Sequence, residues 1–161
     1  MAAGGFDRAA WNELAELGLT ALTVPEAHDG MGQGPIDAMV VAEELGRGIV
    51  LEPIAQAFMA SAVLSHYAPA AVQSAWLPRV ASGEALVVLA QQERKARYRL
   101  DVCEAKAAKA QSGYAVTAIK SVVPAGDKAD AFIVPAQLDG KIALFLVARA
   151  ASGVTTHRHV T

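Results

Sequence analysis

The sequence predicts an α+β protein in which an N-terminal α-helical domain is followed by a small antiparallel β-barrel or sheet domain. The first half is rich in Ala and carries repeated helix start and stop signals. The second half contains three apolar runs between residues 113 and 147, separated by turn sequences. We therefore expect two domains, residues 1–83 and 84–161, joined near Gly83.

Four helices are expected in the first domain, because Pro and Gly punctuate it in the positions that begin and end helices. The first follows Phe6-Asp7 and ends at Gly18, the second begins at Pro35 and ends at Gly46 or Gly48, the third begins at Pro53, and the fourth runs from Pro69 to Gly83. On the second helix, Ile36, Met39 and Val40 fall at helical spacing and define an expected inner face.

The second domain is expected to begin with a strand over residues 86–90, a continuous apolar run typical of a strand buried on both faces. Another strand begins at Tyr114 and should end at residues 122–124, because Pro124 cannot donate to a strand ladder. Asp139-Gly140 lies between two apolar runs. Because Gly tolerates positive φ, this pair predicts a tight hairpin with a type I′ turn.

Composition limits the partners that the chain can have. A formal net charge of −2 gives no general attraction to nucleic acid or to anionic lipid. No apolar run approaches the roughly 20 residues of a membrane span. The single cysteine, Cys103, and the lack of a signal-peptide pattern in residues 1–5 favour a cytoplasmic location. The 53% hydrophobic content favours self-association or a second subunit, particularly through the helix faces around Phe58 and Trp76.

No metal site is expected. His157 and His159 would share one face of a strand, but no third ligand is spaced to join them. Glu43 and Glu44 are adjacent on a helix and therefore point about 100° apart, which does not suit a paired acid and base. The Gly-rich residues 30–34 do not follow a strand in the dinucleotide-binding arrangement, so we interpret them as a loop.

Six blocks of the sequence resemble the acyl-CoA dehydrogenase family, in the family's order and spacing. Each block alone is ordinary sequence, whereas six in register are a specific signal. The blocks are Trp11 to Leu19, Val24-Pro25-Glu26, Glu43-Glu44-Leu45-Gly46-Arg47, Leu77-Pro78 through Glu84, Gly113-Tyr114 with Lys120 and Ala129-Asp130, and residues 144–147 followed by Gly153-Val154.

The resemblance implies an incomplete acyl-CoA dehydrogenase fold, with the helical N-terminal domain and the middle β-domain but no counterpart of the C-terminal helical domain. Members of this family remove two hydrogens from the α and β carbons of an acyl-CoA thioester. A carboxylate of the C-terminal domain takes the α proton, and FAD accepts the β hydride. By this resemblance no residue of the chain is assigned as catalytic, and the catalytic base is expected to come from elsewhere.

The resemblance also implies where FAD would bind. The family's Thr-Glu-Pro and Gly-Ser-Asp elements correspond here to Gln92-Glu93-Arg94 and Arg97-Tyr98-Arg99, and its Trp-Ile-Thr beside the flavin corresponds to residues 122–124. Glu93 with Arg97-Tyr98 is similar to the small subunits of heteromeric acyl-CoA dehydrogenases, such as the pimeloyl-CoA type. The expected cofactor-binding residues are Ala90, Gln92, Glu93, Arg97, Tyr98, Val122, Val123 and Pro124.

Two functions remain open at this point. The chain is either a subunit or fragment of an FAD-dependent acyl-CoA dehydrogenase, or a non-catalytic scaffold that binds a catalytic partner. In the first case the basic segment Arg94, Lys95, Arg97 and Arg99 is expected to meet a pyrophosphate of FAD or CoA, since Arg matches phosphate geometry with a rigid fork. Replacing Arg97 and Arg99 with Ala would test this role. The alternative for this basic segment is a solvated loop that follows a buried strand.

Overall fold

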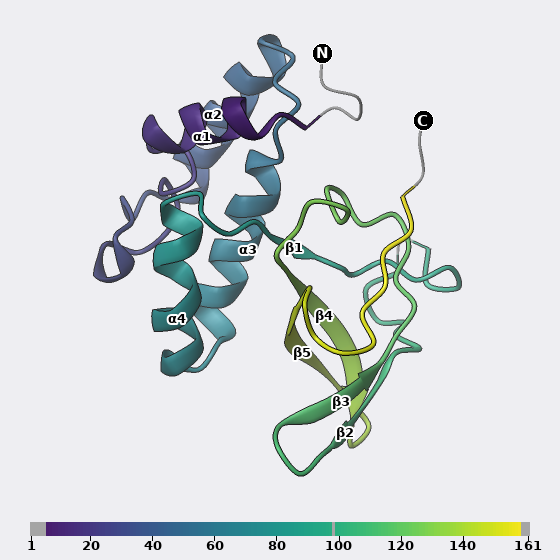
Figure 1. Cartoon of the computed structure of the whole chain (residues 1–161). Helices are drawn as coiled ribbons and strands as arrows, with labels where there is room; N and C mark the ends of the chain where they lie inside the picture. The colour runs from purple at the N-terminus through teal and green to yellow at the C-terminus, as the bar shows by residue number, and fades with distance from the viewer. Residues whose placement is uncertain (1–5, 98, 159–161) are drawn as a thin grey trace. The chain divides into compact units, whose positions relative to one another are not determined.

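The computed structural model describes residues 6–97 and 99–158, which divide into two compact units (Figure 1). One unit contains residues 6–87 with residues 157–158, and the other contains residues 88–156. The first unit is helical and the second contains most of the sheet. We keep the domain assignment of 1–83 and 84–161 as a proposal.

In the described residues of the first unit, four α-helices form where the start and stop signals predicted them, and a short 3-10 helix that was not predicted lies between the first two. Asp7 caps the first helix, because its carboxylate accepts a hydrogen bond of 2.8 Å from the Ala9 amide. Pro35 occupies the first position of its helix, where its missing N–H has no intrahelical partner. The elements are α1 Arg8–Glu16, η1 Glu26–His28, α2 Pro35–Arg47, α3 Ile54–Tyr67 and α4 Ala70–Ala81.

The core of the helical unit is organised around Trp11, which is fully buried. Its indole N–H donates a hydrogen bond of 2.8 Å to the carbonyl oxygen of Gly83. Gly83 has a φ of +72°, and a β-carbon there would lie 2.5 Å from the β-carbon of Ala15. Only glycine satisfies both the left-handed backbone and the close approach, so the turn after α4 is tied directly to α1.

The expected inner face of α2 is wrong, since its apolar side chains are exposed. Ile36 is 72% exposed and Met39 is 63% exposed. Of the two residues around which an association surface was expected, Phe58 on α3 is buried, which contradicts the expectation at that residue, and Trp76 on α4 is half-buried. Helical periodicity identifies which residues share a face, but it does not identify what packs against that face.

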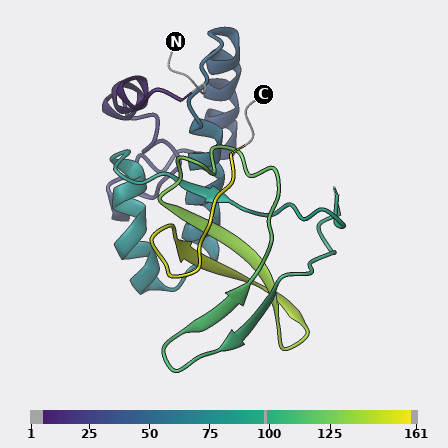
Figure 2. The same ribbon diagram turned by 45° about the vertical axis from the view of Figure 1, so that its right-hand side comes forward.

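The second unit is built around a mixed sheet of five strands that does not close into a barrel within the described residues. The strand order is β1-β4-β2-β3, with β5 paired to β4 (Figures 1 and 2). Two pairs are antiparallel, β2 with β3 and β4 with β5, whereas β2 and β4 are parallel. The strands are β1 Val87–Leu89, β2 Lys106–Lys109, β3 Tyr114–Thr117, β4 Ala131–Leu138 and β5 Lys141–Ala148.

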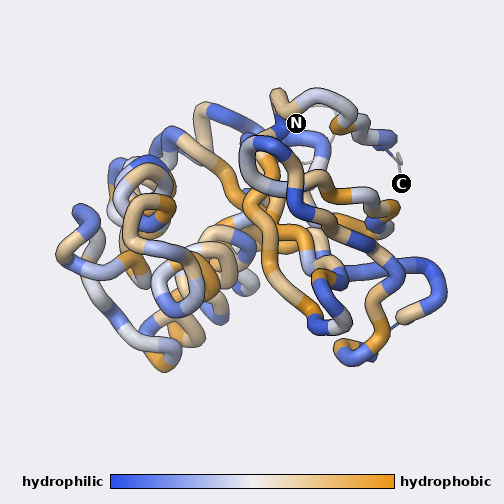
Figure 3. Tube along the Cα trace, turned by 90° about the horizontal axis from the view of Figure 1, so that it is seen from below, coloured by the Kyte–Doolittle hydropathy of each residue, from blue (hydrophilic) through white to orange (hydrophobic). Residues whose placement is uncertain are grey.

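The hairpin between β4 and β5 confirms the predicted turn. Leu138 pairs with Lys141, which leaves a loop of two residues. Asp139 and Gly140 have φ values of +50° and +77°, as a type I′ turn requires at both central positions. Five residues of β4 are buried: Ala131, Phe132, Ile133, Val134 and Ala136. Figure 3 shows hydrophobic and hydrophilic residues alternating along the trace.

Two strand predictions differ from the structure. The strand that begins at Tyr114 ends at Thr117 instead of continuing to residues 122–124. Val122 has a φ of +50°, which is incompatible with a strand. Strand β2 was not predicted, because its sequence Lys-Ala-Ala-Lys has no strand-forming residue and only one of its four residues is even partly buried. No helix among the described residues is both long and apolar enough to span a membrane.

Candidate functional site

Glu93 is the centre of a buried polar cluster in the second unit. The residue is only 4% exposed, although it lies in a segment without regular secondary structure that follows β1. One carboxylate oxygen, Oε2, accepts a short hydrogen bond from the amide of Glu104. The other, Oε1, accepts a hydrogen bond of 3.1 Å from the amide of Ala105. The carboxylate therefore holds the chain just before it enters β2.

Lys120 completes this cluster, 27 residues further along the chain. Its Nζ lies 2.6 Å from Oε1 of Glu93 and 2.8 Å from the carbonyl oxygen of Pro135 in β4. The Lys120 side chain is 7% exposed, so both charges of the ion pair are shielded from water. Cys103 Sγ contacts the same two acceptor groups, at 3.7 Å from Glu93 Oε1 and 3.5 Å from Pro135 O.

The environment of Glu93 lowers the pKa of its carboxyl group. Burial by itself raises this pKa, but the hydrogen bonds from Lys120 and from the amides of Glu104 and Ala105 outweigh burial and leave the net pKa below its ordinary value. Glu93 is therefore an ionised structural carboxylate near neutral pH. Burial raises the pKa of the neighbouring Cys103 thiol, which disfavours the thiolate.

The lowered pKa of Glu93 predicts a specific loss of stability in acid. The unfolded carboxyl group binds protons near its ordinary pKa of about 4.3, whereas the folded group binds them only at lower pH. The stabilisation is thus fully present above about pH 4.3 and is lost as the pH falls through the folded pKa. Urea unfolding between pH 6 and 3 should show a steeper acid loss for the wild-type chain than for Glu93→Gln.

The matched control is Glu16→Gln, which makes the same change at an exposed position at the end of α1. This variant should keep the wild-type pH dependence of the free energy of unfolding. Parallel pH profiles for the wild-type chain and Glu93→Gln would contradict the assignment of Glu93 as the buried acid.

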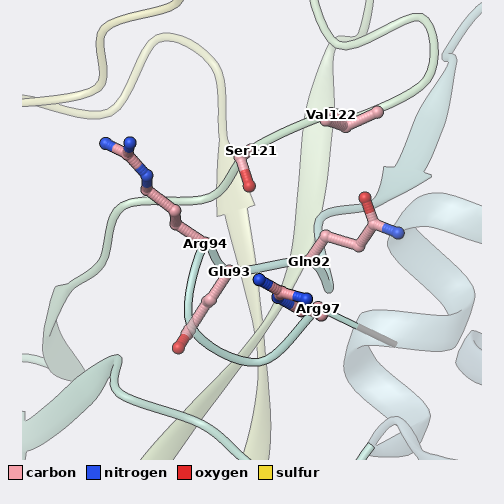
Figure 4. A pocket seen from close by; sticks show the side chains of 6 residues that line it. All are labelled: Gln92, Glu93, Arg94, Arg97, Ser121 and Val122. Carbon is pink, nitrogen blue, oxygen red and sulfur yellow. The ribbon is translucent and has the colours of Figure 1, made fainter. Parts of the chain in front are cut away.

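An open hollow lies beside the cluster, with a volume of about 360 Å³. Six residues from two segments line it: Gln92, Glu93, Arg94, Arg97, Ser121 and Val122. Figure 4 shows that the Glu93 carboxylate points away from Ser121 and Val122. The side chains of Gln92 and Arg97 lie near each other in this view, while Arg94 extends in another direction. The hollow is thus edged by polar and cationic groups.

The backbone of the hollow is held in an uncommon conformation. Arg97 and Val122 have φ values of +50°, in the left-handed region. For a β-branched residue such as Val122 this conformation is a genuine outlier, of the kind that persists only where the surroundings enforce it. The two segments are joined directly, because the Ser121 amide donates a hydrogen bond of 2.9 Å to the carbonyl oxygen of Gln92.

Two of the four cations in the basic segment are neutralised by nearby carboxylates. Lys95 Nζ lies 2.8 Å from Glu104 Oε1, and the Arg99 guanidinium contacts both carboxylate oxygens of Asp101, at 3.1 and 2.6 Å. Arg94 and Arg97 form no ion pair within residues 6–97 and 99–158. The two unpaired guanidinium groups are therefore those that line the hollow.

The hollow contains four of the expected cofactor-binding residues, Gln92, Glu93, Arg97 and Val122. Ala90 is buried, and its amide donates to the carbonyl oxygen of Ile133, so it supports the sheet. Val123 and Pro124 follow Val122 but do not line the hollow. Tyr98 lies outside the described residues, as does His159. That the eight expected residues bind the cofactor stays a prediction.

Sequence reasoning missed Ser121 as a lining residue, and it did not connect Lys120 with Glu93. The only available signal was that Lys120 lies in one of the six blocks and that Glu93 corresponds to the Glu of the family's Thr-Glu-Pro element. An ion pair across this separation could not be derived from spacing, because it depends on the β2–β3 hairpin that lies between the two positions, and β2 carries no strand signal.

Residues 1–84 match the model of the N-terminal domain of acyl-CoA dehydrogenases. The match covers just over half of the chain. This chain belongs to the acyl-CoA dehydrogenase family. The family resemblance read from the sequence blocks is therefore confirmed, as is a helical domain followed by a small sheet in an incomplete acyl-CoA dehydrogenase fold.

Relatives of known sequence and structure support the same family beyond residue 84. Acyl-CoA dehydrogenase FadE27 of Mycobacterium tuberculosis is 29% identical over 92% of this chain and 39% of its own length. The solved ChsE4-ChsE5 complex from the same species contains a chain with 29% identity and a TM-score of 0.82, over 93% of this chain and 40% of that one.

A third relative was solved with cofactor. An acyl-CoA dehydrogenase complexed with FAD from Bacillus anthracis is 26% identical, with a TM-score of 0.80, over 93% of this chain and 27% of that one. The chain spans 37 to 39% of the length of the first three curated relatives that it matches. These relatives therefore have residues outside the matched part.

Proposed function

We propose that this chain is a subunit or part of an FAD-dependent acyl-CoA dehydrogenase and that the hollow at Gln92–Arg97 and Ser121–Val122 receives part of the cofactor. The observation that carries the proposal is that Arg94 and Arg97 line this hollow and form no ion pair with any other residue that the structure describes. Family membership supplies the chemical context, since a solved relative carries FAD.

The residues present fit FAD in charge and in polarity. Arg94 and Arg97 offer guanidinium donors to a pyrophosphate, and the geometry of this group suits bidentate contact with phosphate oxygens. Gln92 and Ser121 add polar groups, and the exposed side chain of Val122 offers an apolar contact. When bound, FAD supplies the acceptor for the hydride that leaves the β carbon of the acyl-CoA. Val123 and Pro124 flank this part of the site in the proposal.

We also propose that another acyl-CoA dehydrogenase subunit completes the site. The described hollow has one lining carboxylate, Glu93, and this group is engaged with Lys120 and two backbone amides. The base for the α proton is therefore proposed to come from residues outside the hollow. Exposed Ile36 and Met39 on α2 provide apolar surface that a subunit would cover. The solved ChsE4-ChsE5 complex shows that a relative assembles with a second chain. We propose a cytoplasmic location for the complex.

The alternative is a non-catalytic scaffold that keeps the fold and binds a catalytic partner. One observation favours it: Glu93, the residue that survives from the family's Thr-Glu-Pro element, turns away from the rest of the hollow and has a structural role. Under this alternative the chain would associate with its partner without contributing to flavin binding.

A flavin titration separates the two functions. The purified chain would be mixed with FAD, alone and with a candidate acyl-CoA dehydrogenase subunit, and the flavin absorbance bands would be followed after removal of free cofactor. We expect retained flavin and a shifted spectrum that depend on Arg94 and Arg97. A complex that retains flavin equally well when both arginines are replaced would favour the scaffold.

A further inference from the structure

We propose that the buried Glu93–Lys120 ion pair is a positioning element that holds the two walls of the hollow in their binding conformation. Neither charged group is needed to touch the ligand. The identity of the ligand, FAD, rests on the proposed function. The backbone conformation that the ion pair explains is a property of this chain and does not depend on that function.

The pair is placed where it can control both walls. Glu93 directly follows Gln92 in one wall, and Lys120 directly precedes Ser121 in the other. The 2.6 Å contact between Glu93 Oε1 and Lys120 Nζ therefore runs beside the Ser121 N–H to Gln92 O hydrogen bond. Two adjacent links of different kinds join the same two segments.

The pair is also anchored to the sheet on both sides. The Glu93 carboxylate accepts the amide hydrogen of Ala105, immediately before β2. Lys120 donates to the carbonyl oxygen of Pro135, within β4. β2 and β4 are neighbouring parallel strands. The ion pair therefore attaches both walls of the hollow to the same part of the sheet.

The conformation of the walls requires such a constraint. Val122 lies two residues after Lys120, and Arg97 lies four residues after Glu93, and both have a φ of +50°. Only a few per cent of residues other than Gly adopt positive φ, and β-branched residues do so least. Without the pair, the walls would occupy their binding conformation for a small fraction of the time, and the apparent affinity would fall by that fraction.

The first test measures the backbone directly and needs no ligand. Amide hydrogen exchange would be followed by NMR in the full chain and in Lys120→Met. We expect the amides of Ser121 and Arg97, which bond to Gln92 O and Glu93 O, to exchange at least about tenfold faster in the variant. The amide of Ala90, which bonds to Ile133 O, should keep its protection. An equal increase in the exchange rates of all three amides would show that the ion pair only stabilises the fold in general, and this would overturn the proposal.

The second test measures binding of FAD to the same proteins. Loss of the enforced positive φ should weaken FAD binding by about tenfold to thirtyfold in Lys120→Met. Lys95→Met is the matched control, because it removes an ion pair to Glu104 in which both side chains are exposed. Unchanged FAD affinity and unchanged exchange at Ser121 and Arg97 in Lys120→Met would refute the proposal.

A double variant separates positioning from overall stability. Removing one partner leaves a buried charge without its counter-ion, whereas removing both charges does not. Glu93→Gln combined with Lys120→Met should therefore recover stability to urea relative to Lys120→Met, while exchange at Ser121 and Arg97 stays fast. If the double variant recovered both its stability to urea and the slow exchange of the Ser121 and Arg97 amides, the positioning role would be overturned. If the wild-type chain binds no FAD either alone or with a second acyl-CoA dehydrogenase subunit, the proposed function fails for this chain, and the exchange measurements still decide the role of the pair.

Discussion

Replacing Arg94 and Arg97 together with alanine is expected to weaken FAD binding by about two to four orders of magnitude, since hydrogen bonds to charged groups contribute about 1.5 to 3 kcal/mol each. Both side chains line the hollow and form no ion pair within the described residues. Their donors are therefore available to phosphate oxygens without first breaking an existing contact. The measurement is a titration of the chain, or of its complex with a second subunit, with FAD and with CoA.

The same basic segment provides the matched control. Lys95→Ala combined with Arg99→Ala also removes two positive charges, but these cations are already paired with Glu104 and Asp101. This control should change the affinity by less than about tenfold, because exposed ion pairs contribute little to stability and the long-range field is screened by salt. From the sequence, Arg94, Lys95, Arg97 and Arg99 were all candidate pyrophosphate contacts, and Arg97 with Arg99 was the pair chosen for replacement. Because Arg99 is paired with Asp101, the test here replaces Arg94 together with Arg97.

Thermal melts of the same variants distinguish lost binding from lost folding. Arg94 and Arg97 are exposed, so replacing them should leave the melting temperature close to the wild-type value. Equal affinities of the Arg94/Arg97 variant and the wild-type chain for both ligands would leave these residues as a solvated loop. A loss of affinity that matches the loss in the Lys95/Arg99 control would indicate a general charge effect instead of specific contacts.

The 161-residue chain by itself is expected to show no dehydrogenation of acyl-CoA. Removal of the α proton requires a base within hydrogen-bond reach of the carbon, with a pKa near the working pH. Glu93 is the carboxylate that lines the hollow, and its pKa lies below the ordinary value of a carboxyl group. A carboxylate that is stabilised by Lys120 and by two backbone amides is a weak base, and it points away from the rest of the hollow.

The assay follows reduction of an artificial electron acceptor with acyl-CoA substrates of several chain lengths, in the presence of added FAD. Adding an acyl-CoA dehydrogenase subunit that carries a base should restore turnover, and this restored turnover should decrease when Arg94 and Arg97 are replaced. Turnover by the isolated chain above the rate without protein would falsify this expectation. In that case Glu93→Gln would show whether Glu93 is the base after all.

Much of the local structure could be derived from the sequence, because its determinants are neighbours in the chain. Asp139-Gly140 allows positive φ at both central positions of a turn, and this property belongs to the two residues themselves. Pro35 starts α2 for an equally local reason, the absence of an N–H. The run at residues 86–90 predicted β1, since a strand buried on both faces needs continuous apolar side chains.

The pairing of distant segments was decided only by the tertiary structure. The Lys-Ala-Ala-Lys sequence of β2 carries no strand signal, and it forms a strand because β3 and β4 offer hydrogen-bonding edges on both sides. The parallel alignment of β2 with β4 likewise depends on the route of the chain between them. Val122 does not continue β3, because its left-handed backbone turns the chain away from the sheet.

For the candidate site, the resemblance of the sequence blocks to one family predicted that family and the segments that border the hollow. A resemblance of this kind depends only on which residues are present and in what order. The folded structure was needed to show that Glu93 is buried against Lys120, that Lys95 and Arg99 are paired with carboxylates, and that Arg94 and Arg97 line the hollow. The electrostatic role of a charged residue depends on its distance from other charges and from water, and these distances exist only once the chain has folded.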